Sequence, residues 1–346
     1  MYCGIVKNSH EKLLFTLYFI SLYYSAYILF KVIQSGSLFL LEKNMLELNE
    51  KKVRKGKAVG LPYVGSKKKI SKKIVEIIKQ NFGTDKTVYD LFGGGGAITA
   101  ELLINNINVV YNEIDKSVCD MLSTVLVEDR EWLKTLLVSR EEFVAIREKD
   151  IKSTDDELKL LVNSFGNNRK SYLYSKEVSD LKYNLVKQII DIEDVFSGYK
   201  KTTTYQRAVN LYEEKLVFFD KEEKGRVLQQ LQQLERLQQL QQLQKLDLLE
   251  VNNKDYREYS DISNSIIYLD PPYEKSSNTY EGGSFDSQAL YDWAFKMAKN
   301  NTVLISSYEV SDPRFEVVYE FKTARSTFQN GKPGKRYEKL FMVKMA

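Results

Sequence analysis

A run of four glycines, residues 93–96, constrains the fold of this chain more than any other feature of its sequence. The preceding residues, 87–91, are β-branched and apolar, which predicts a strand, and residues 97–103 have the composition of a helix. A glycine turn between a strand and a helix lets a ligand approach bare backbone at the helix N-terminus. The run therefore predicts the first half of a doubly wound α/β unit.

An acidic residue follows this turn at the spacing found in nucleoside-binding folds. Glu113 lies 20 residues after Gly93, which is where a carboxylate meets the ribose hydroxyls of a nucleoside cofactor. The turn is not a P-loop, because no Gly-Lys-Ser/Thr follows it. The alternative interpretation is structural, with a glycine turn that permits close packing of helix on sheet and with Glu113 as a helix-capping acid.

A second strand–helix–strand pattern begins at residue 265. Residues 266–269 form an apolar strand that ends at Asp270, residues 287–299 have helical spacing, and residues 302–306 form another strand. Two further strands are expected at residues 315–321 and 339–344, joined by the turn-rich residues 330–334. We expect the two halves to share one sheet, interrupted by an inserted, mainly helical domain over residues 125–253.

The residues that end the apolar strand are Asp270, Pro271, Pro272 and Tyr273, and they suit chemistry on the exocyclic amine of a base. Such an amine is a poor nucleophile because its lone pair is delocalised into the ring. A carboxylate from Asp270 and the Pro271 carbonyl, fixed in direction by two prolines, would accept its two protons and free the lone pair. Tyr273 offers a ring on which an extruded base stacks. The structural alternative is a strand end with a proline stop and a surface tyrosine.

Together these motifs resemble the D12 class of adenine-specific DNA methyltransferases, the group of the Dam-type enzymes and their phage and prophage relatives, over residues 61–344. Residues 61–67 resemble the N-terminal cofactor motif of the family, which implies that Tyr63 and Lys67 contact S-adenosylmethionine. Lys254-Asp255-Tyr256 resembles the segment whose acidic residue reads the adenine of the cofactor. The resemblance implies this cofactor-binding set: Tyr63, Lys67, Phe92, Gly93, Gly94, Gly95, Glu113, Asp255 and Asp270.

The resemblance also implies a fold and a reaction. The fold is a Rossmann-like S-adenosylmethionine methyltransferase sheet, built here from residues 45–124 and 254–346, with residues 125–253 as the target-recognition domain. The reaction is direct methyl transfer to N6 of an adenine flipped out of double-stranded DNA. The implied catalytic residues are Asp270, Pro271, Pro272 and Tyr273.

The composition excludes several other chemistries. Two cysteines, Cys3 and Cys119, and one histidine, His10, supply neither a zinc site nor a disulfide framework nor a histidine base. We therefore expect no metal ion. The net charge of +4 permits DNA binding without requiring it. Phosphate contacts are expected from basic residues that are otherwise ordinary solvated charges: Arg169, Lys170, Lys332, Lys335 and Arg336.

The first 44 residues differ from the rest of the chain. Residues 13–30 carry no charge and are just long enough to cross a bilayer as a helix. The alternatives are a membrane segment and an upstream artefact of translation, with Met45 as the true start. We expect a cytoplasmic monomer whose only membrane contact would come through residues 13–30.

Leucines recur every three residues from Leu228 to Leu246, with glutamine at most positions between them. A spacing of three advances by about 300° on an α-helix, so these leucines wind around the helix instead of forming one stripe. This disfavours a coiled coil. Two interpretations stay open: a tolerant helix lengthened by repeat slippage in the gene, and a surface for oligomerisation.

Two classes of alternative function remain open on the sequence. The same fold could methylate RNA or the exocyclic amine of cytosine, although cytosine-amine enzymes more often carry serine in place of Asp270. The chain could instead be a catalytically silent DNA-binding protein or a membrane-tethered interaction module. The glycine loop and the Asp270 motif are both intact, which argues against a decayed enzyme.

Overall fold

The computed structural model describes residues 45–63, 65–215, 228, 230–247, 250–274, 285–325 and 337–344. The chain divides into two units, Met1–Leu46 and Glu47–Ala346, and the elements below belong to the second. Residues 13–30, for which a membrane segment was one alternative, lie outside the described residues, as do Lys332, Lys335 and Arg336. Within the described ranges, no helix combines the length and the apolar character needed to cross a membrane.

A seven-stranded sheet forms the centre of the second unit, in the order β3-β2-β1-β4-β5-β7-β6. Neighbouring strands from β3 to β5 in this order are parallel, and β7 is antiparallel to both β5 and β6. The strands are β1 (Val88–Asp90), β2 (Val109–Asn112), β3 (Val251–Asn252), β4 (Ile266–Leu269), β5 (Thr302–Ser307), β6 (Phe315–Arg325) and β7 (Tyr337–Val343). Both halves of the sequence share this sheet, which confirms the predicted α/β fold.

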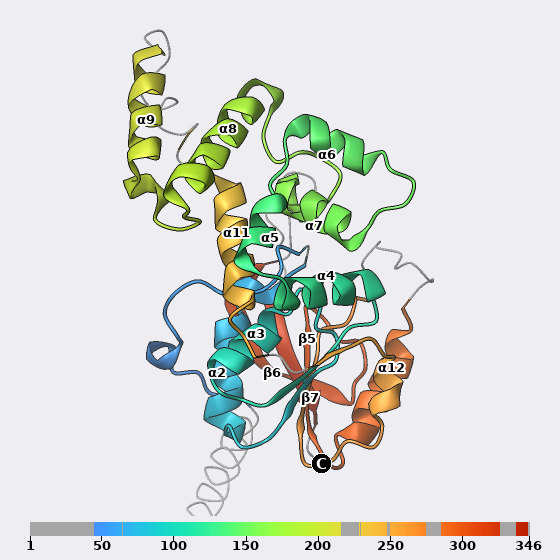
Figure 1. Cartoon of the computed structure of the whole chain (residues 1–346). Helices are drawn as coiled ribbons and strands as arrows, with labels where there is room; N and C mark the ends of the chain where they lie inside the picture. The colour runs from blue at the N-terminus through green and yellow to red at the C-terminus, as the bar shows by residue number, and fades with distance from the viewer. Residues whose placement is uncertain are drawn as a thin grey trace, which may run out of the picture. The chain divides into compact units, whose positions relative to one another are not determined.

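Helices cover both faces of the sheet, with α2 and α3 on one side and α12 on the other (Figure 1). We call the sheet and the helices that pack on it the sheet unit. Its α-helices are α2 (Ser71–Phe82), α3 (Ala97–Ile104), α4 (Lys116–Val127) and α12 (Ser287–Met297). Three short 3-10 helices accompany them: η1 (Glu50–Lys52), η2 (Lys67–Lys69) and η5 (Tyr256–Tyr259).

The position of β4 explains the apolar run before Asp270. All four residues of β4 are buried, and Ile267 and Leu269 pack with α12 in one hydrophobic cluster. A strand covered on both faces requires a continuous apolar run instead of alternation. The strand order reverses between β1 and β4, since β1 continues to β2 and β4 continues to β5. Ligands of such sheets bind outside the carboxyl ends of the strands at this reversal.

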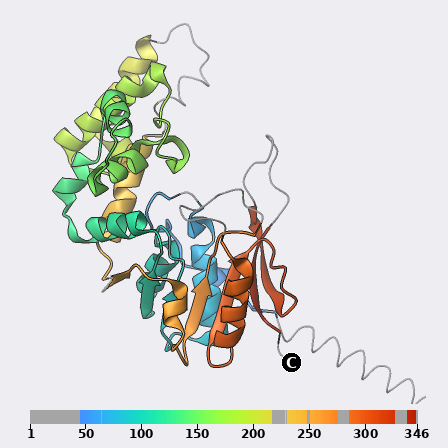
Figure 2. The ribbon, with the colours of Figure 1, turned by 90° about the vertical axis from the view of Figure 1, so that its right-hand side faces the viewer.

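A helical insertion connects α4 to β3, and Figure 2 shows its helices gathered beyond one end of the sheet. The predicted range, 125–253, begins inside α4 and includes β3. Val251 and Asn252 instead pair with β2 in the sheet, and a strand of two residues is too short to be recognised from its pattern. The insertion contains α5 (Arg130–Thr135), α6 (Arg140–Arg147), α7 (Thr154–Asn163), η3 (Phe165–Asn167), α8 (Lys176–Glu193), η4 (Tyr199–Lys201), α9 (Thr203–Lys215) and α11 (Gln232–Leu243).

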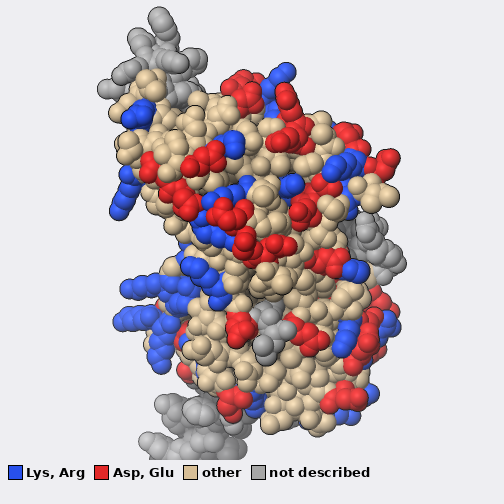
Figure 3. All heavy atoms as spheres, in the orientation of Figure 1, with Lys and Arg blue, Asp and Glu red and all other residues tan. Residues whose placement is uncertain are grey.

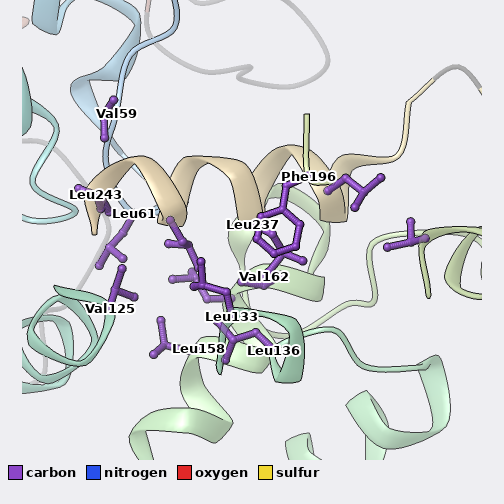
Figure 4. Packing of buried hydrophobic residues seen from close by; sticks show 14 of the residues in the cluster. Val59, Leu61, Val125, Leu133, Leu136, Leu158, Val162, Phe196, Leu237 and Leu243 are labelled. Carbon is purple, nitrogen blue, oxygen red and sulfur yellow. The ribbon is translucent and has the colours of Figure 1, made fainter. Parts of the chain in front are cut away.

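The leucine repeat runs through the interior of the protein, and its middle part forms α11. Its leucines pack in one hydrophobic cluster with residues of the sheet unit and of the insertion, among them Leu61, Val125 and Leu158 (Figure 4). No residue of α11 is exposed, so leucines that wind around the helix contact protein on every side. The buried leucines of the repeat therefore belong to the core of this chain. The buried leucines are Leu228, Leu231, Leu234, Leu237, Leu240 and Leu243.

Within the repeat, Glu235 and Arg236 replace the glutamines between two leucines, and the structure explains the arginine. The guanidinium of Arg236 is buried and donates to the carbonyls of Val162 and Ser164, each at 2.7 Å, where α7 ends. The last carbonyls of a helix have no partners within it, and a cation there also interacts favourably with the helix dipole. Burial lowers the pKa of Arg236 to about 10, which leaves it charged at neutral pH.

We expect Arg236→Leu to lower the free energy of unfolding by about 2–4 kcal/mol, because buried carbonyls lose their donor. Urea unfolding of the full chain measures this loss. Gln241→Leu is a matched control at a half-buried position of the same helix, and it should change the free energy by less than about 1 kcal/mol. Equal effects of the two substitutions would show that Arg236 does not stabilise the end of α7.

Candidate active site

A cavity of about 500 Å³ opens at the carboxyl ends of β1, β2 and β4. Its size is typical of cavities that hold cofactor-sized ligands. Asp90 ends β1, Glu113 follows β2 and Asp270 follows β4, and all three line the cavity. The structure brings every predicted cofactor-binding and catalytic residue to this one wall: Tyr63, Lys67, Phe92, Gly93, Gly94, Gly95, Glu113, Asp255, Asp270, Pro271, Pro272 and Tyr273.

Two residues of the glycine loop, Gly93 and Gly95, are packed too closely for side chains. A Cβ on Gly93 would lie 2.3 Å from the ring of Tyr111, which is buried in β2. Gly94 has a φ of +48°, and its N–H donates to Oε2 of Glu113 at 2.8 Å. Glu113 therefore holds the loop in place as well as lining the cavity, and burial raises its pKa. The N-cap of α4 is Asp115 and not Glu113.

Lys67 lies at the centre of the predicted catalytic residues. Its Nζ donates to Oδ1 of Asp270 at 2.6 Å and to the hydroxyl of Tyr273 at 2.8 Å. Oε1 of Glu338 lies 3.7 Å from the same nitrogen. Burial alone would lower the pKa of Lys67, but the carboxylates of Asp270 and Glu338 outweigh it and raise that pKa above its usual value. Lys67 is therefore a buried, charged donor.

Glu338 is a member of this network that the sequence did not reveal. It is buried in β7, where its Oε2 accepts from the hydroxyl of Tyr273 and its Oε1 from the hydroxyl of Ser306, both at 2.9 Å. In the sequence, Glu338 stands out only as an acidic residue next to an expected strand. The antiparallel pairing of β7 with β5 brings it beside Ser306 and Tyr273.

Asp270 is a carboxylate in a buried and crowded environment. Burial raises its pKa to about 6, although the positive charge of Lys67 opposes this and the negative charge of Glu338 adds to it. Oδ1 of Asp270 accepts from Lys67, while among the described residues no donor contacts Oδ2. The side chain is 18% exposed. At neutral pH Asp270 is thus ionised and has an oxygen available to a ligand.

Asp90, at the end of β1, is a second site residue missing from the prediction. Its Oδ2 accepts from the backbone N–H and the hydroxyl of Thr99, at 3.2 and 2.7 Å. Its Oδ1 is buried without a partner among the described residues. Burial raises the pKa of Asp90 to about 7. A buried acceptor without a donor in the wall of a cavity indicates a ligand that donates a hydrogen bond.

Aromatic rings form another part of the wall. The ring of Phe92 lies 5.6 Å from that of Tyr256 and 5.9 Å from that of Phe285. Tyr256 begins η5, and Asp255 is the N-cap of this helix. The carboxylate of Asp255 also forms an ion pair with Arg257 at 2.7 Å. A ligand that contacts Asp255 therefore shares this carboxylate with Arg257.

The wall is acidic on balance. Among the described residues five carboxylates and three basic side chains line it, which favours a ligand that carries positive charge. The acidic residues are Asp90, Glu113, Asp255, Asp270 and Asp286, and the basic ones are Lys67, Lys254 and Arg257. In the part of the chain that the structure describes, no three His, Cys, Asp or Glu side chains are grouped to hold a metal ion.

Arg169 and Lys170, the two described residues among those predicted to contact DNA, lie in the insertion and do not line the cavity. Arg169 has a φ of 58° and donates to Glu157 at 2.8 Å. Lys170 is exposed. Their contact with phosphates stays a prediction.

Three comparisons with known proteins bear on this cavity. The family profile described as D12 class N6 adenine-specific DNA methyltransferase matches residues 63–311. No curated protein matches the sequence. Among solved structures, the rRNA methyltransferase aviRa from Streptomyces viridochromogenes matches with 12% identity and a TM-score of 0.32, over 79% of this chain and 84% of that one. A likeness this weak carries no argument about function.

Proposed function

Since the chain belongs to the D12 class of N6 adenine-specific DNA methyltransferases, we propose that its cavity holds S-adenosylmethionine and that Asp270 receives the target adenine. One observation carries this proposal. The residues that the sequence motifs identified, of which Tyr63 is the first and Tyr273 the last, all line a single cavity at the carboxyl ends of the parallel strands.

The cavity wall fits this cofactor. S-adenosylmethionine carries a positive sulfonium and a positive ammonium group, which suit a wall with an excess of carboxylates. Its ribose hydroxyls suit Glu113, and its adenine suits the rings around Phe92. The ammonium group is a donor for the unpartnered Oδ1 of Asp90. Asp255 is the proposed contact of the adenine of the cofactor.

The catalytic end of the cavity suits activation of an amine. When bound, S-adenosylmethionine supplies a methyl group activated on sulfur. Oδ2 of Asp270 and the Pro271 carbonyl would accept hydrogen bonds from the two N–H groups of the adenine N6 amine, which makes the nitrogen lone pair available for in-line attack. Asp270 would take up the one proton that the amine loses. Lys67 keeps Asp270 ionised and occupies its other oxygen. Pro272 restricts the backbone that carries this carbonyl.

Tyr273 is well placed to support the extruded base. Its hydroxyl is fixed between Lys67 and Glu338, and its ring lies 4.5 Å from the ring of Tyr308. A tyrosine held at both its hydroxyl and its ring presents a fixed face for stacking, which offsets part of the cost of flipping the base.

The helical insertion is the proposed target-recognition domain, and the sheet unit on either side of it is the proposed catalytic domain. Arg169 and Lys170 are the proposed phosphate contacts of the insertion. We expect the enzyme to act on double-stranded DNA as a monomer in the cytoplasm.

We expect Asp90→Asn to weaken S-adenosylmethionine binding about 10- to 100-fold, because a charge-assisted hydrogen bond contributes about 1.5–3 kcal/mol. Isothermal titration calorimetry on the full chain measures this change. Since the pKa of Asp90 is about 7, binding by the parent should strengthen as the pH rises through 7. The variant should show a smaller pH dependence.

The control for this experiment is Asp120→Asn, which neutralises an aspartate on α4 that is 44% exposed and paired with Lys116. It should bind the cofactor like the parent. Equal affinities of parent and Asp90→Asn would rule out the ammonium contact. No binding by the parent would contradict the cofactor assignment itself.

A further inference from the structure

The segment just before the cavity, residues 47–57, is lysine-rich and yet firmly held by its neighbours. Such a composition predicts a loosely solvated segment. In the structure, Glu47 exchanges two hydrogen bonds with Asn81 of α2, both at 2.9 Å. Lys72 of α2 donates to the carbonyl of Gly56 at 2.6 Å. We call residues 51–57 the basic segment, and its backbone is thus fixed on the sheet unit.

Arg54 is the main anchor of the basic segment. Its Nε and Nη2 donate to the two carboxylate oxygens of Glu101, each at 2.7 Å, and Glu101 is buried in α3. The same guanidinium donates to the carbonyls of Lys55 and Lys57, each at 3.0 Å. A bidentate pair of this kind fixes geometry as well as supplying energy. Arg54 therefore orders the backbone that carries the neighbouring lysines.

The lysines of the basic segment remain available at the surface. All four are exposed, and no described acidic residue forms an ion pair with them. Figure 3 shows basic side chains gathered at the edge of the molecule where Figure 1 draws this part of the chain in blue. The four are Lys51, Lys52, Lys55 and Lys57.

The chain itself places the basic segment close to the cavity. Tyr63 lines the cavity and follows Lys57 by six residues, a length of chain that spans at most about 22 Å. Between them the N–H of Leu61 donates to the carbonyl of Gly95 in the glycine loop at 2.8 Å. Because duplex DNA rises about 3.4 Å per base pair, Lys57 lies within roughly six base pairs of Tyr63, and the other three lysines precede it in the chain.

We propose that the basic segment binds the phosphate backbone of duplex DNA beside the target adenine. This inference rests on the proposed function, which brings a duplex to the mouth of the cavity. Four positive charges on an ordered backbone lose less conformational freedom on binding than charges on a mobile tail. DNA is favoured over an anionic lipid surface because the segment continues directly into the wall of the catalytic cavity.

The test measures DNA affinity as a function of salt for the full chain and for the variant Lys51→Gln/Lys52→Gln/Lys55→Gln/Lys57→Gln. Each lysine–phosphate contact contributes about −0.9 to the slope of log K against log salt concentration. We expect the variant, which lacks four lysines, to show a slope shallower by about 3.6 and an affinity at least about tenfold lower in low salt. Its cofactor affinity and its kcat at saturating DNA should equal those of the parent.

The matched control makes the same charge change elsewhere, as Lys296→Gln/Lys299→Gln/Lys322→Gln/Lys344→Gln at four exposed positions. Lys296 lies in the last turn of α12 and Lys299 just after it, whereas the N-terminal end of this helix lines the cavity. The control should keep the parent slope. If the basic-segment variant had the same salt slope as the control, this inference would be overturned and the proposed function left intact. The same holds if the variant lost affinity for anionic lipid vesicles but kept its affinity for DNA. A parent that methylates no DNA would instead defeat the proposed function.

Discussion

Asp270→Asn is expected to lower kcat for methyl transfer to DNA by at least about 10³-fold. Asparagine preserves the size of the side chain, but it cannot accept from the adenine amine with a full negative charge, and it leaves Lys67 without its ionic partner at 2.6 Å. Steady-state transfer of labelled methyl groups to duplex DNA measures the loss. Dissociation constants for cofactor and DNA should change by only a few fold, because most of their contacts lie elsewhere.

The control for this variant is Asp286→Asn, on the same cavity wall. Asp286 is the N-cap of α12, and asparagine is an equally good N-cap residue. Its kcat should stay within about threefold of the parent value, since N-cap replacement by asparagine costs little. If Asp270→Asn kept more than about a tenth of the parent kcat, Asp270 would not be the main acceptor of the amine protons.

Lys67→Gln is expected to move the ascending limb of the kcat–pH profile to higher pH and to lower kcat at pH 7 at least about tenfold. Asp270 must be ionised to accept protons, and its pKa is about 6, so kcat of the parent should rise through pH 6. The charge of Lys67 opposes the effect of burial on this pKa. Without it the carboxyl group stays protonated to higher pH, and activity should recover as the pH rises.

Glu338→Gln should shift the ascending limb of the kcat–pH profile in the opposite direction. The charge of Glu338 raises the pKa of Asp270, so its removal should move the ascending limb to lower pH. Because misfolding cannot produce opposite shifts, the pair of variants separates electrostatic tuning from general damage. Loss of activity in both variants with an unchanged pH profile would assign Lys67 and Glu338 a purely structural role.

Local sequence pattern revealed two motifs of the site that lie beside strand ends, while Tyr63, Lys67 and Asp255 were implied by the family resemblance. The glycine turn after β1 and the Asp270 motif after β4 each combine an apolar strand with residues that end it, so their position in the fold follows from local pattern alone. Parallel strands bring their carboxyl ends to one edge of a sheet. This is why residues separated by a long insertion could be assigned to one cavity.

Most features that the sequence did not reveal depend on long-range pairing. Asp90 differs, because it ends a strand and only the folded structure shows that one of its oxygens has no partner among the described residues. Glu338 reaches Lys67 only because β7 enters the sheet antiparallel beside β5, and an acidic residue in a strand pattern gives no indication of its partners. Val251 and Asn252 form too short a strand to stand out. The leucine spacing on α11 was interpreted as tolerant or oligomeric, because a helix buried on all sides is recognised only once its neighbours are known.

The most direct test of the central claim is methyl transfer from labelled S-adenosylmethionine to unmethylated duplex DNA by the full chain, with the modified nucleoside identified by mass. We expect N6-methyladenine from the parent protein and at least about 10³-fold less of it from Asp270→Asn. A product of N4-methylcytosine, transfer to RNA in place of DNA, or cofactor binding without transfer to any duplex would contradict it.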